Sequence, residues 1–163
     1  MDDVGLLALE TSKDLYGKLK HDFQALTKEE NSYNYFNFVV TANHLVEWIS
    51  KDDKLPISFR QRAEEIRSVW QHELIQDMAN RGKHFIRKDY IREKQISKDK
   101  YIPGFSYEDF SYKDFNYGGP VFVVQYKGKG VDLYKACGHV FNFYTGLFEG
   151  EDQAQGWKQN NKV

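Results

Sequence analysis

Apolar side chains recur three or four positions apart along most of the chain, which is the spacing of one face of an α-helix. A first helix is predicted to end near residue 27, with Asp2 or Asp3 as its capping residue. A third is predicted over residues 58–81 and a last one over residues 132–148. Each pairs one apolar face with a polar one, so these helices are expected to pack side by side.

A second helix, predicted over residues 33–50, carries apolar side chains around most of its circumference. Helices of this kind are usually central and buried. We therefore expect it to lie inside the molecule, with the few polar side chains that it carries, His44 and Glu47 among them, in an apolar setting.

Residues 121–126 are mostly β-branched or aromatic and predict a strand, followed by a turn at residues 127–130. The basic segment 85–100 fits either a frayed helix or an exposed strand. The predicted fold is mainly α: a four- to five-helix up-down bundle with a small β-hairpin or extended insertion before the last helix. We expect one domain over residues 1–150, with the insertion at 101–130 and a flexible tail at 151–163.

The 163 residues include 23 basic and 24 acidic ones, for a net charge of −1, and a single cysteine. This balance gives no overall field toward nucleic acid or an anionic membrane, and one cysteine excludes an internal disulfide. An acidic start and the absence of a long apolar run predict a cytoplasmic protein without a membrane segment.

The third predicted helix offers a first candidate site. At 100° per residue, four polar side chains fall along one edge beside the apolar stripe, where a bundle groove opens to solvent: Glu73, Asp77, Asn80 and His84. Such a set can position a substrate and move a proton, with Lys83 and Arg81 beside it to hold a phosphate. The alternative is an ordinary helix end whose cations complement the helix dipole.

A second candidate lies on the second predicted helix, where His44, Glu47 and Trp48 share a face. A histidine in an apolar setting has a lowered pKa, which a nearby carboxylate opposes, and this suits a general base or a binding residue. The alternative is a core histidine with satisfied hydrogen bonds. The five histidines show no Glu-x-x-His spacing, so we expect neither a metal nor a cofactor.

Residues 105–119 contain one pentapeptide three times, which predicts an extended loop or an irregular hairpin arm. Its aromatic side chains form either a stacking platform, a surface for a protein partner, or a loop without a specific role. These side chains are Phe105, Tyr107, Phe110, Tyr112, Phe115 and Tyr117.

The second predicted helix, with His44 and Trp48, and the later segment from Asp77 to His84 resemble small bacterial proteins of the HEPN superfamily. The resemblance covers about the first 85 residues. It implies a helical bundle, often dimeric, and in many members a metal-independent ribonuclease that uses an arginine followed, after four to six residues, by a histidine.

No arginine stands at that distance before His84, whereas Arg67 and His72 fit the spacing. On one continuous helix these two side chains would lie 140° apart. The sequence therefore favours a HEPN-like binding or regulatory module, with a role in bacterial defence or a toxin–antitoxin pair. The alternatives are a metal-independent endoribonuclease that uses His84 or His72, and a structural protein for homodimers or other partners. The partners left open are a small ligand, RNA or a nucleotide, a protein and a second copy of the chain.

Overall fold

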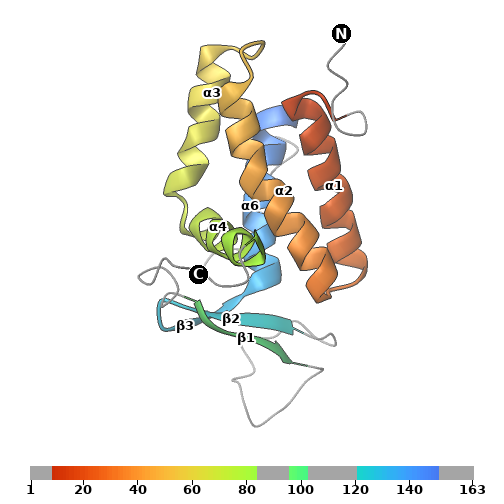
Figure 1. The fold of residues 1–163 in the computed structure, drawn as a ribbon, viewed down its shortest axis with the longest axis vertical. Coiled ribbons are helices and arrows are strands. Elements are labelled where there is room, and N and C mark those ends of the chain that lie inside the picture. Colours follow the sequence, from red (N-terminus) through yellow and green to blue (C-terminus); the bar gives the residue numbers. More distant parts are fainter. Residues whose placement is uncertain (1–8, 84–95, 103–120, 151–163) are drawn as a thin grey trace.

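The computed structural model describes residues 9–83, 96–102 and 121–150, and the chain folds into α-helices with a small antiparallel sheet at one end (Figure 1). The helices are α1 (Ser12–Lys28), α2 (Ser32–Lys51), α3 (Ile57–Glu64), α4 (Trp70–Lys83) and α6 (Leu133–Glu149), with a short 3₁₀ turn, η1 (Glu65–Ser68), after α3. The strands are β1 (Ile96–Ile102), β2 (Val121–Tyr126) and β3 (Lys129–Asp132), in the order β1-β2-β3. The prediction of a mainly helical bundle with a small β element before the last helix is confirmed.

The core lies where α1, α2 and α6 pack together. Leu19, Phe38 and Tyr144, one from each helix, are fully buried, and the Tyr144 hydroxyl donates to the backbone oxygen of Ala42. Cys137 on α6 is also fully buried. Helix α4 runs across the lower end of the bundle, between α2 and the sheet (Figure 1).

One polar network is built into the contact between α1 and α2. The Lys18 Nζ atom lies 2.5 Å from Asp22 Oδ2 and donates to Thr41 Oγ1 at 2.7 Å, and the Thr41 hydroxyl donates to the same Asp22 oxygen at 2.6 Å. Asp22 and Thr41 are buried. Since a buried carboxylate is stable only with partners, this network favours one register of the two helices.

The predicted start of the first helix is wrong. Helix α1 begins at Ser12, and Asp2 and Asp3 lie outside the described residues. Thr11 is the capping residue: its hydroxyl accepts from the Asp14 backbone N–H, and the Asp14 carboxylate accepts from the Thr11 backbone N–H at 2.9 Å. This reciprocal arrangement satisfies two N–H groups that a helix start otherwise leaves unpaired.

Replacing Thr11 by alanine is therefore expected to destabilise the fold by about 1 kcal/mol, because the cap is lost while no core side chain changes. Lys13→Ala, at an exposed position in the same turn, is the matched control and should change stability little. Urea unfolding followed by circular dichroism measures both. Equal stability of the two variants would contradict the capping role.

The predicted single helix over residues 58–81 is also wrong. The chain leaves helical geometry at Val69, whose φ is −87° and ψ is 123°, and α4 then starts in a new direction. The apolar spacing continues across this break, so the pattern alone does not reveal it. Ile66 and Leu74 are buried on either side of the break, whereas Trp70 is 45% exposed.

Candidate functional site

A depression lies between β3, the start of α4 and the first two turns of α6. These three elements meet at the sheet end of the bundle (Figure 1). We call it the hairpin groove. Its volume is about 580 Å³, and it is lined by all four residues of β3, by Trp70 and Gln71 of α4, and by Lys135, Ala136 and His139 of α6. Clefts of this size suit ligands the size of a nucleotide.

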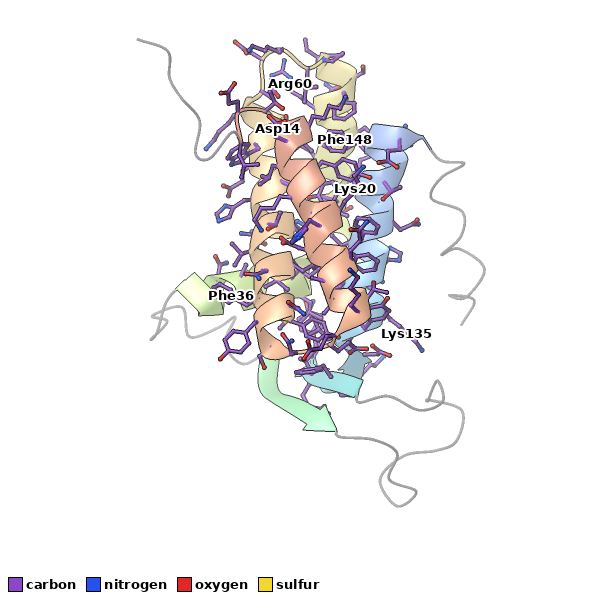
Figure 2. All side chains as sticks on the ribbon, turned by 90° about the vertical axis from the view of Figure 1, so that its right-hand side faces the viewer. Asp14, Lys20, Phe36, Arg60, Lys135 and Phe148 are labelled. Carbon is purple, nitrogen blue, oxygen red and sulfur yellow. The ribbon has the colours of Figure 1, made fainter. Side chains whose placement is uncertain are left out.

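The local sequence explains how β3 and α6 reach this position. Lys127 and Gly128 have positive φ values of 49° and 78°, which is the geometry of a two-residue hairpin turn between β2 and β3. Asp132 ends β3 and caps α6, with its carboxylate accepting from the Lys135 backbone N–H at 3.1 Å. One turn of helix therefore separates the strand from Lys135, whose side chain lies at the sheet end in Figure 2.

The lining of the hairpin groove carries more positive than negative charge. Among the residues that line the groove, Lys129 and Lys135 are exposed and carry positive charges, and Asp132 carries the one carboxylate. Burial lowers the pKa of His139, so its imidazole is neutral near pH 7. The groove therefore attracts an anion locally, although the chain as a whole is nearly neutral.

Trp70 gives the same groove an aromatic wall. Its ring is stacked near that of Tyr126, with centroids 6.1 Å apart and an interplanar angle of 20°. The hairpin tip is tied to α4 beside it, since Lys127 Nζ donates to Glu73 Oε2 at 3.0 Å. Trp70 is thus held in place while almost half of it is open to a ligand.

The break at Val69 gives Arg67 and His72 a geometry that the continuous-helix prediction missed. Arg67 Nε donates to Glu64 Oε2 at 2.6 Å, and Glu64 also accepts from the Ser50 hydroxyl. His72 is 1% exposed, and burial, reinforced by the charge of Arg67 and opposed by Glu64, lowers its pKa to about 4. Arg67 and His72 are therefore electrostatic neighbours, but His72 lies inside the molecule.

The predicted edge of α4 is only partly present. Asp77 is 1% exposed, so its expected place at a solvent-facing groove is wrong: this side of α4 faces the core because the helix lies across the bundle. Asn80 is half-buried nearby on the same helix. His84 and the side chains of Arg81 and Lys83 lie outside the described residues.

The expectation of a buried His44 is wrong as well. The side chains of His44 and Glu47 are 46% and 48% exposed, with His44 Nδ1 3.8 Å from Glu47 Oε2, on the outward face of α2. Trp48 packs partly against the core and lines a second depression of about 370 Å³ with Lys51 and Asp52. These three predicted residues do not share a site with Asp77.

Sequence reasoning placed no site at the hairpin groove. Lys129 was part of a predicted turn, Trp70 part of an apolar stripe, and Lys135 and His139 part of the last helix. The available signal was the close spacing of Lys129 and Lys135 on either side of the junction between a short strand and the helix that follows it. Trp70, which lines the same groove, is far from both lysines along the chain, so the sequence does not show that the three residues meet.

Among the described residues, no group of three or more histidine, cysteine or acidic side chains is placed to hold a metal ion, and no helix is long and apolar enough to cross a membrane. The predicted aromatic repeat at 105–119 and the tail at 151–163 lie outside the described part of the chain. No family model, no curated protein and no solved structure matches the chain.

Proposed function

We propose that this protein is a binding module that holds a phosphate-bearing ligand in the hairpin groove. The observation that carries the proposal is that Lys129 and Lys135 both line one cleft, and that Trp70 lines it too. Lysines bind phosphate as point charges, and a partly enclosed cleft strengthens that attraction by excluding water. RNA and nucleotides, which are among the partners that the sequence left open, both carry such phosphates.

Binding is preferred over ribonuclease activity because of where His72 lies. A general base must come within hydrogen-bond reach of the hydroxyl that it deprotonates. His72 is 1% exposed, so an RNA 2′-hydroxyl cannot reach it, and with a pKa of about 4 it is a weak base for removing the hydroxyl proton. Four expectations stay predictions from the sequence: catalysis through His84, membership of the HEPN superfamily, a role in bacterial defence and homodimer formation.

Replacing both Lys129 and Lys135 by glutamine is expected to weaken phosphate binding about tenfold or more, because both ammonium groups of the groove are lost. Isothermal titration calorimetry at low salt, with pyrophosphate, ribose 5-phosphate, adenosine monophosphate and a short RNA, measures this. Lys13→Gln is the control: it makes the same Lys→Gln change once, removing one positive charge from the first turn of α1, and the neighbouring Asp14 lies at the opposite end of the bundle from Lys135 (Figure 2).

Two results would contradict the proposal. One is that the wild-type protein binds none of the four ligands. The other is that the double variant and the Lys13→Gln control bind all of them equally well.

A further inference from the structure

The edge of β3 that faces away from β2 adds a third kind of contact to the hairpin groove. Strand β3 is the last in the order β1-β2-β3 and pairs with β2 alone among the described strands. In a two-residue hairpin the residues flanking the turn form a hydrogen-bonded pair, and such pairs alternate along the ladder. Tyr126 and Lys129 flank this turn, so Lys129 and Val131 direct their backbone groups to β2.

Gly130 lies between those two residues and directs its backbone N–H and C=O to the opposite edge. It is exposed, and like the rest of β3 it lines the groove. The groove therefore offers one donor and one acceptor side by side on a strand edge. This is the hydrogen-bonding complement of the polar edge of a nucleobase, which presents donors and acceptors next to each other.

We propose that the hairpin groove binds a nucleoside monophosphate, with the base stacked on Trp70, the polar edge of the base against Gly130, and the phosphate between Lys129 and Lys135. This inference rests on the proposed phosphate-binding function and names the ligand class. A flat ring with a polar edge and one anionic group uses all three features of the groove. A sugar phosphate uses only the lysines, and an apolar ring uses only the tryptophan.

An extended acidic peptide would also complement the lysines and could add to the edge of β3. Strand addition draws its affinity from main-chain hydrogen bonds repeated along several residues. Strand β3 has four residues, and its last one, Asp132, already caps α6. By the same alternation Asp132 faces outward too, but the C=O of an N-cap residue accepts the first hydrogen bond of its helix. Within β3, Gly130 is then the residue that directs both backbone groups outward, which favours a small planar ligand over a peptide strand.

The test compares adenosine monophosphate, ribose 5-phosphate and adenosine, titrated into the full-length protein by calorimetry. We expect adenosine monophosphate to bind at least about tenfold more tightly than either of the other two, since stacking on an aromatic side chain adds about that factor or more. Trp70→Leu should lower the affinity for adenosine monophosphate most of the way to that for ribose 5-phosphate, because the stacking contact is lost while the backbone of Gly130 remains. Trp70→Phe, which keeps a ring, should retain most of the affinity.

The same titrations separate the two proposals. Equal binding of adenosine monophosphate and ribose 5-phosphate, with both lost in the double lysine variant, would overturn the nucleotide inference and leave the phosphate-binding function standing. Binding of an acidic peptide but of no phosphate ligand would overturn both. Unchanged ribose 5-phosphate affinity in Trp70→Leu is the internal control that this variant folds.

Discussion

Phe38→Ala is expected to destabilise the fold by roughly 3–5 kcal/mol, the usual cost of removing a buried phenylalanine ring. Phe38 is fully buried on α2, and its ring packs against Phe23 of α1 with the centroids 5.7 Å apart. The substitution removes that contact and leaves a cavity between two helices that cannot easily close around it. A domain of this size is stable by about 5–15 kcal/mol, so a large share of its stability would be lost.

Phe36→Ala is the matched control for this prediction. Phe36 lies two residues earlier on the same helix and is 49% exposed, on the outer side of α2 (Figure 2). Both substitutions change helix propensity by the same amount, so the difference between them reports burial alone. Urea unfolding should show Phe36→Ala within about 1 kcal/mol of wild type. Similar losses in both variants would mean that Phe38 does not lie in the core.

The second large effect is a loss of stability in mild acid through His72. Its pKa is about 4 in the folded protein and near 6.5 in the unfolded chain. Between these values the unfolded state binds the proton and the folded state does not, so lowering the pH from 6.5 to 4 favours unfolding. The difference in pKa corresponds to about 3 kcal/mol, fully lost only near pH 4.

His72→Gln isolates this contribution, because glutamine has a similar size and does not titrate. Carboxylates with lowered pKa values, such as Asp52 and Glu64, also cost stability in acid, but they remain in both proteins. The wild type should therefore lose up to about 3 kcal/mol more than His72→Gln between pH 7 and pH 4 in urea titrations. Parallel pH profiles of the two proteins would show that His72 is accessible to protons in the folded state.

The sequence pattern predicted those elements whose local signals agree with their packing. Helix α2 spans Ser32–Lys51 where residues 33–50 were predicted, and α6 begins at Leu133, one residue after its predicted start at Asp132. The capping box of Thr11 and Asp14 is also readable from the sequence, although an earlier acidic pair gave a competing start signal. In these cases apolar period, cap chemistry and burial point to the same boundaries.

The break at Val69 and the hairpin groove depend on contacts between distant segments. Neither glycine nor proline stands near Val69, and the apolar period continues past it, so the break follows from the packing of α4 across the end of the bundle. That same turn of the chain brings Trp70 to Lys129 and Lys135. Periodicity also identifies the faces of α2 without saying which face stays uncovered, which is why His44 was expected inside.

Cys137, the only cysteine of the chain, allows the opening of the core to be followed by chemical labelling. Its thiol is fully buried on α6, and burial raises its pKa well above the ordinary value. A thiol reagent reacts with the exposed thiolate, so the folded protein is inert and labelling proceeds only through states in which α6 has opened. The rate of labelling therefore measures how often α6 opens, and no cysteine has to be introduced for the measurement.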